Sequence, residues 1–154
     1  MSVTTFIKQA ALLGFVVLAL GVGCTCPSTN PDVNPDCPQG TRAATSLTIN
    51  ANLSSIRPIG QTIQLKIRGN RTSTDLCFAP GAQTSFLVAK LEGTGTVNQA
   101  VPNLADGNWT IEVTALSGGN QAPVTLTPNL AAGGNHTLSI SGNASGDLTA
   151  TYQN

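Results

Sequence analysis

Beyond Thr45 the apolar residues recur at every second position, and this period limits what the chain can fold into. In the segment 62–68, Ile63, Leu65 and Ile67 lie on one side and the residues between them are polar. Such alternation is typical of a strand with one buried face, and no stretch after Thr45 keeps a helical period. The other alternating apolar positions are Leu47, Ile49, Ala51 and Leu53; Trp109, Ile111, Val113 and Ala115; Val124 and Leu126; Leu138 and Ile140; and Leu148, Ala150 and Tyr152. We therefore expect about six to eight short antiparallel strands.

Glycine-rich turns separate these alternating segments. They include Gly69-Asn70, Asp106-Gly107, Gly118-Gly119 and Gly133-Gly134. Short strands joined by such turns predict an all-β fold, a single antiparallel two-sheet sandwich over residues 46–154. The run from Phe86 to Leu91 is apolar on both sides, so we expect it to be a central strand.

One motif in this region resembles a known class of domain. In the segment Leu104-Ala-Asp-Gly-Asn-Trp109-Thr-Ile-Glu-Val113, a Leu and a Gly precede an aromatic residue that opens an alternating strand. This pattern resembles immunoglobulin-like, fibronectin-like and transthyretin-like modules of envelope proteins. The resemblance covers about a tenth of the chain and implies a sandwich fold without specifying a ligand.

The N-terminus has the three parts of an export signal. Lys8 supplies the positive charge, residues 10–23 form an uncharged apolar run, and the run ends in small residues. As a helix this run would span about 21 Å, which is shorter than the ~30 Å hydrocarbon core of a membrane. We therefore interpret residues 1–23 as a signal peptide, removed after export.

The end of this signal resembles the lipobox of bacterial lipoproteins. The residues are Gly21-Val22-Gly23-Cys24, and the chain has Gly21 where that family usually has Leu. The resemblance implies that Cys24 is acylated, becomes the new N-terminus and anchors the protein to a membrane, with palmitate among the acyl chains. Thr25 after the cysteine implies the outer membrane of a two-membrane bacterium. The alternative is ordinary signal cleavage, which yields a periplasmic or freely secreted protein.

The segment 24–45 is expected to be a disordered tether. Pro27, Pro31, Pro35 and Pro38 follow one another at short intervals, and few apolar residues are available to form a core. Such composition favours extended, polyproline-like conformations. A tether of this kind holds an anchored domain clear of the membrane surface.

The four cysteines leave several pairings open. If Cys24 carries lipid, Cys26, Cys37 and Cys77 remain as candidates for a disulfide, with one thiol left over. A Cys26–Cys37 bond would close a loop inside the tether, and a Cys37–Cys77 bond would fasten the tether to the domain. Without lipid all four can form two disulfides. No metal site is expected, because the only histidine is distant and the Cys24-Thr25-Cys26 spacing is unlike that of zinc sites.

Charge and ionisable residues exclude several function classes. Lys and Arg number 7, Asp and Glu number 7, and charged residues are 9% of the chain, so no basic surface is available for nucleic acid. We expect no cofactor and no enzymatic activity, because the carboxylates and His136 show no catalytic spacing. His136 is expected to be hydrogen-bonded and partly exposed at a loop exit.

Binding residues are harder to choose from sequence. Trp109 and Tyr152 are candidates for a sugar-stacking platform, although a single Trp at the start of an amphipathic strand is more often a core anchor. Asp106 could offer an oxygen to calcium, but Asp106-Gly107-Asn108 more often forms a turn. The predicted partners are a membrane through the lipid anchor, and another envelope protein or a surface glycan. The sequence therefore predicts a small lipid-anchored envelope protein with a structural or binding domain; the alternative is a secreted carbohydrate- or protein-binding module.

Overall fold

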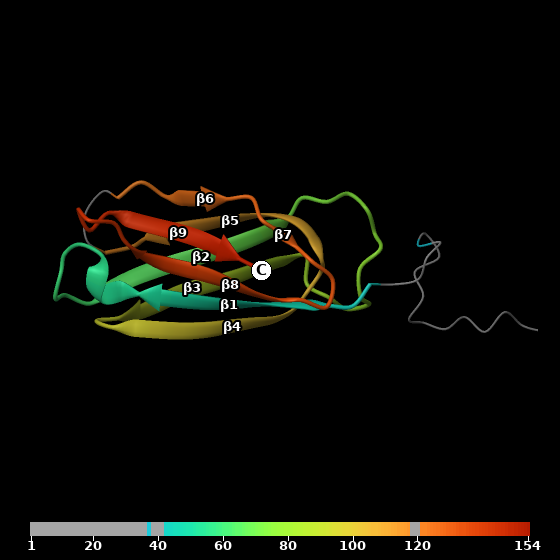
Figure 1. The fold of residues 1–154 in the computed structure, drawn as a ribbon, viewed down its shortest axis with the longest axis horizontal. Helices are drawn as coiled ribbons and strands as arrows, with labels where there is room; N and C mark the ends of the chain where they lie inside the picture. Colours follow the sequence, from blue (N-terminus) through green and yellow to red (C-terminus); the bar gives the residue numbers. More distant parts are fainter. Residues whose placement is uncertain (1–36, 38–41, 118–120) are drawn as a thin grey trace, which may run out of the picture.

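The structure is a computed structural model that describes Cys37, residues 42–117 and residues 121–154. The predicted signal peptide, Cys24, Cys26 and most of the predicted tether lie outside these residues. The described part is all-β, with two sheets that face each other (Figure 1). Its elements are β1 (Thr45–Asn52), a 3-10 turn η1 (Leu53–Ser55), β2 (Ile63–Arg71), β3 (Ser85–Gly93), β4 (Thr96–Leu104), β5 (Gly107–Ala115), β6 (Val124–Leu126), β7 (Asn129–Leu130), β8 (Asn135–Gly142) and β9 (Leu148–Gln153).

The two sheets have different strand orders. One runs β4-β1-β8-β9, and the other runs β3-β2-β5-β6 with the short β7 paired to β5. Along the described strands the chain changes sheet four times: between β1 and β2, between β3 and β4, between β4 and β5, and between β7 and β8. The two sheets do not close into a barrel, so strands β4, β9, β3 and β6 end the two orders.

The prediction of a purely antiparallel sandwich is wrong for one strand pair. β1 and β8 run parallel, with Leu47 opposite His136 and Ile49 opposite Leu138. The other paired strands of the described residues are antiparallel. Side-chain alternation has the same period in both kinds of sheet, so the sequence pattern carried no information about strand direction.

The alternating residues form the core between the sheets, as their period predicted. Ile63, Leu65 and Ile67 of β2 are fully buried, and each lies between exposed or half-buried polar neighbours. The fully buried set also includes Leu47, Ile49, Leu104, Ile111, Val113, Leu130 and Leu138. Leu53 is buried too, although it belongs to η1 and does not continue strand β1.

The prediction that residues 86–91 form a central strand is also wrong, because β3 lies at an edge of its sheet. A bulge explains the misleading run. Leu65 pairs with Leu91 and Ile67 pairs with Val88, so two β3 residues oppose Lys66. The extra residue reverses the alternation, and Phe86 and Leu91 both reach the core while Leu87 is 60% exposed. The run looks apolar on both faces because its alternation changes phase partway along.

Trp109 is the core anchor that the sequence favoured. Its side chain is fully buried, and its indole N–H donates a 2.9 Å hydrogen bond to the carbonyl oxygen of Ala105. The Phe86 ring lies 5.9 Å from the Trp109 ring, centroid to centroid. Gly69 makes room for this pair, because a Cβ at this position would overlap the Phe86 ring. The buried indole cannot serve as a stacking platform for sugars.

Candidate functional site

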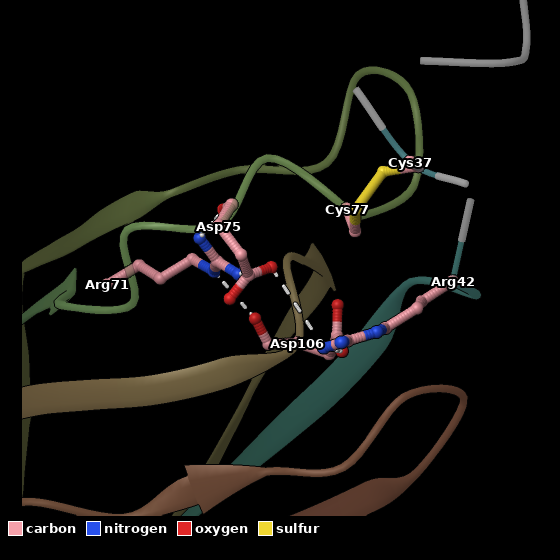
Figure 2. Close-up of a disulfide and its surroundings, with 6 residues drawn as sticks. All are labelled: Cys37, Arg42, Arg71, Asp75, Cys77 and Asp106. Atoms are coloured by element: carbon pink, nitrogen blue, oxygen red, sulfur yellow. Dashed lines mark hydrogen bonds and ion pairs between the residues drawn. A yellow bond between two sulfur atoms is a disulfide. The ribbon is translucent and has the colours of Figure 1, made fainter. Parts of the chain in front are cut away.

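Among the predicted site cysteines, Cys37 and Cys77 are joined by a disulfide (Figure 2). Their Cα atoms are 5.2 Å apart, within the usual range, and their positions differ by 40 in the sequence. Cys77 lies in the loop between β2 and β3, so the bond fastens the segment before β1 to the domain. This disulfide points to an extracytoplasmic, oxidising location. Cys24 and Cys26 lie outside the described residues.

The disulfide adjoins a cluster of four charged residues, Arg42, Arg71, Asp75 and Asp106, shown together in Figure 2. We call these four residues and the disulfide the tether junction. Arg71 is the residue around which the β2–β3 loop is arranged. Its Nη1 donates to the carbonyl oxygens of Ser73, at 2.9 Å, and Asp75, at 2.7 Å, while its Nη2 donates to the Asp75 carboxylate at 2.9 Å. The loop bearing Cys77 is therefore held by a nearly buried guanidinium.

Two further contacts fix the Arg71 side chain. Its Nε donates a 2.6 Å hydrogen bond to the Asp106 carbonyl oxygen, and its guanidinium carbon lies 4.9 Å from the centre of the Phe78 ring. Gly107 lies close by with φ of +112°, and a Cβ there would come within 2.6 Å of the Ser73 hydroxyl. A residue with a side chain would fit poorly at Gly107 for both reasons.

Asp106 connects this loop to the segment before β1. Its side chain is 4% exposed, and its Oδ2 accepts a 2.9 Å hydrogen bond from Nη1 of Arg42. Its other carboxylate oxygen, Oδ1, is buried and has no hydrogen-bond partner among the described residues. An ion pair with Arg42 thus occupies the carboxylate that the sequence offered as a calcium ligand. Within the part of the chain that the structure describes, no group of three or more His, Cys, Asp or Glu residues is placed to hold a metal.

The electrostatics of the junction act on Asp75. Desolvation works to raise the pKa of Asp75, but the Arg71 hydrogen bond and charge, the Cys77 backbone and the Arg42 charge together lower this pKa below its ordinary value. The same environment acts on Arg42, whose pKa is raised by its hydrogen bond and charge interaction with Asp106. Both shifts favour the charged forms and therefore favour the ion pairs.

His136 is buried, which corrects the prediction that it is partly exposed. It is 3% exposed on β8, between β1 and β9. Its Nδ1 lies 2.7 Å from the Tyr152 hydroxyl, and its Nε2 lies 3.2 Å from the Ala131 carbonyl oxygen. The prediction weighed its position at a loop exit, whereas His136 lies on the buried face of β8 with Leu138 and Ile140. The residues around it are a phenol, amides and carbonyls, and no carboxylate is hydrogen-bonded to it in the described part of the chain.

The two faces of the Tyr152 ring are not both open for stacking on a sugar. Its ring stacks on the His136 imidazole, with centroids 5.6 Å apart, and its hydroxyl donates to the Asn129 carbonyl oxygen at 2.8 Å. Burial raises the pKa of Tyr152, so its hydroxyl stays protonated at neutral pH. This cluster ties β9 to β8 and to the β7 strand.

A groove on the outer face of the β3-β2-β5-β6 sheet is a binding candidate that the sequence predictions missed. Its volume is about 460 Å³, within the range of small-molecule sites. The lining residues are Lys66, Arg68, Asn70, Gln83, Ser85, Phe86 and Leu87. The signal was present in the polar half of the alternating segment, where Lys66 and Arg68 follow each other on the solvent-facing side. Neighbouring strands had to be known before these residues could be grouped.

Comparison with known proteins gives no match to a family model, to a curated protein or to a solved structure. Among the described residues, no helix has the length and apolar character needed to cross a membrane.

Proposed function

We propose that the chain is a small lipid-anchored protein of the bacterial cell envelope whose sandwich domain has a binding or structural role and no catalytic one. The observation that carries this proposal is the Cys37–Cys77 disulfide, which fastens the predicted tether to the domain. A covalent link at this point is useful when the preceding segment holds the protein in place. It also requires an oxidising compartment, which agrees with export.

The strand order bears on two of the domain classes that the Leu104–Val113 motif resembles, the immunoglobulin-like and the transthyretin-like. In immunoglobulin constant-type domains the first two strands share a sheet. Here β1 and β2 belong to different sheets. We therefore favour the transthyretin-like interpretation over the immunoglobulin-like one.

The pairing of ionisable groups supports a role without catalysis. Asp75, Asp106, Asp147, Glu92 and Glu112 each form an ion pair with an Arg or Lys side chain. His136 is surrounded by a phenol, an amide and a carbonyl. A general base needs a free carboxylate or imidazole beside a substrate, and these groups have other partners. The predicted roles that remain for the domain are binding of a partner and a structural role.

Cys24→Ser tests the lipid anchor. We expect the wild-type protein to incorporate labelled palmitate and to fractionate with the outer membrane, and we expect Cys24→Ser to do neither. Cys26→Ser is the matched control and should behave as the wild type. The anchor proposal is refuted if Cys24→Ser still carries the label and stays with the membrane.

Counting free thiols distinguishes the lipid-anchored protein from the alternative, a freely secreted binding module. With Cys37 and Cys77 paired, acylation of Cys24 leaves Cys26 as a single thiol in the denatured mature protein. The secreted form, cleaved before Cys24, would pair Cys24 with Cys26 and leave none. Intact mass distinguishes these cases further, because only the anchored form gains the mass of the acyl chains.

A further inference from the structure

The groove on the outer sheet face has a defined set of side chains above a regular backbone. Lys66, Arg68 and Asn70 project from the exposed side of β2. Across the strand pair, Arg68 lies opposite Leu87 and Asn70 lies opposite Ser85. Gln83 precedes β3 and lines the same groove. Because these residues, apart from Gln83, occupy paired strands, their spacing is set by the sheet and not by a loop.

Lys66 differs in charge balance from the other cations of the domain. Arg42, Arg57, Arg68, Arg71 and Lys90 each form an ion pair with a carboxylate. Lys66 forms no ion pair with any described residue. Arg68 in the same groove is paired with Glu112 at 3.1 Å, so the uncompensated positive charge of the groove lies at Lys66. A ligand with a single negative charge would balance it.

The residues opposite Lys66 on the two neighbouring strands carry no negative charge. Two β3 residues oppose Lys66 where a regular ladder would place one. One of them, Lys90, forms an ion pair with Glu92 on its own strand, with Nζ of Lys90 2.7 Å from Oε2 of Glu92. On the other side, Lys66 pairs in register with Thr114, which carries no charge. Neither neighbouring strand therefore places a carboxylate directly opposite Lys66, and the carboxylates of Glu92 and Glu112 pair with Lys90 and Arg68.

The uncharged polar groups of the groove suit hydroxyl groups. The side chains of Asn70 and Ser85 have no hydrogen-bond partner among the described residues. The Gln83 amide nitrogen donates to the Pro102 carbonyl oxygen at 3.2 Å, which leaves its side-chain oxygen as an acceptor. Amides and hydroxyls both donate and accept, so together they can satisfy a ligand that carries several hydroxyl groups.

We propose that this groove binds an acidic saccharide, with a uronate carboxylate on the Lys66 ammonium and neighbouring hydroxyls on Asn70, Gln83 and Ser85. The inference deepens the proposed binding role of the domain by naming its ligand class. A nucleic acid would need several phosphate contacts, and only one cation of the groove is unpaired. A peptide would need apolar anchoring pockets, and Leu87 is the exposed apolar side chain that the groove offers.

The test is titration calorimetry of the full-length protein in detergent with oligogalacturonate and oligomannuronate. We expect at least one of these to bind, the corresponding methyl ester to bind about tenfold more weakly or worse, and Lys66→Gln to cause a similar loss. Raising the salt concentration should weaken wild-type binding. Lys90→Gln is the matched control, because Lys90 lies on the same sheet but is paired with Glu92, and it should bind as the wild type.

Several outcomes would overturn the inference. These are equal binding of acid and ester, unchanged binding by Lys66→Gln, tighter binding of poly-glutamate than of either saccharide, or no saccharide binding at all. Urea unfolding of Lys66→Gln establishes that the variant is folded; because the side chain is exposed, its midpoint should match the wild type. Failure of saccharide binding would not refute the proposed lipid anchor, because palmitate labelling at Cys24 tests the anchor separately.

Discussion

Arg42 and Asp106 lie 64 positions apart in the sequence, yet Nη1 of Arg42 is 2.9 Å from Oδ2 of Asp106. The carboxylate is buried and the guanidinium is half exposed, so the carboxylate depends on this one partner for its Oδ2. Removing Arg42 would leave a buried charge without compensation. The contact also holds the segment just before β1 against the start of β5.

The first prediction concerns this ion pair. We expect Arg42→Ala to lower the urea midpoint, because the Asp106 carboxylate stays buried without its donor. Adding Asp106→Asn to Arg42→Ala should recover part of the loss, because the uncompensated charge is then gone. A double-mutant cycle of urea unfolding measures both effects. Strict additivity of the two substitutions would contradict this account.

The second prediction concerns the pH dependence of stability. Arg71 and its neighbours lower the folded-state pKa of Asp75 below its ordinary value of 3.8, against the opposing effect of desolvation. A depressed folded pKa means that this carboxylate stabilises the fold above about pH 3.8, and that its contribution is lost as the pH falls through the folded value.

Asp75→Asn tests the sign of this linkage. The wild type should exceed Asp75→Asn in free energy of unfolding at pH 6, and the difference should shrink below pH 3.8, the ordinary value. Urea titrations at pH 6, 4, 3 and 2 measure the difference. A gap that stays constant over this range would exclude the linkage.

The third prediction concerns the disulfide. For a loop spanning a sequence separation of 40, chain entropy gives a stabilisation of about 4 kcal/mol. Reductant should lower the unfolding free energy of the wild type by about this amount and should not affect Cys37→Ser/Cys77→Ser. Cys26→Ser is the control and should retain the full response to reductant. An equal shift in the double variant would mean that reductant acts elsewhere.

The fourth prediction concerns a close approach between the end of β8 and the turn η1. Gly142, at the end of β8, donates its N–H to the Ser55 hydroxyl at 2.8 Å, and a Cβ at Gly142 would overlap the Ser55 carbonyl oxygen. The obstacle is backbone, so Gly142→Ala should cost about 1–3 kcal/mol. Gly95→Ala is the control, because nothing lies within 4 Å of its added methyl group. Thermal unfolding should separate the two variants clearly, and equal melting temperatures would disprove the steric argument.

The sequence predicted the strands better than it predicted their arrangement. The alternation of Ile63, Leu65 and Ile67 depends only on local geometry and on a single buried face, so it could be read directly. The edge position of β3 could not, because its bulge reverses the alternation between Val88 and Leu91 and makes an edge strand look buried on both sides. Direction was equally hidden, as β1 and β8 show.

The candidate sites depended on contacts between distant residues. Cys37–Cys77 was one of several pairings left open by the sequence, and only the fold brings these two residues together. The Arg42–Asp106 pair has no local signal, since 64 positions separate the two residues in the sequence. The groove around Lys66 became visible once β3 was placed beside β2. His136 likewise contacts Tyr152, which lies 16 positions further along the chain.

The disulfide has a mechanical consequence for a chain held at its N-terminus. β1 and β2 both lie between Cys37 and Cys77, inside the covalently closed loop. Tension applied to the residues before Cys37 and resisted at the C-terminus takes the shortest covalent path, through the two sulfur atoms to Cys77. These two strands, each paired on both sides within its sheet, therefore cannot be drawn out by a pull on the tether. A force transmitted from the residues before Cys37 would reach the domain first at the loop that Arg71 holds.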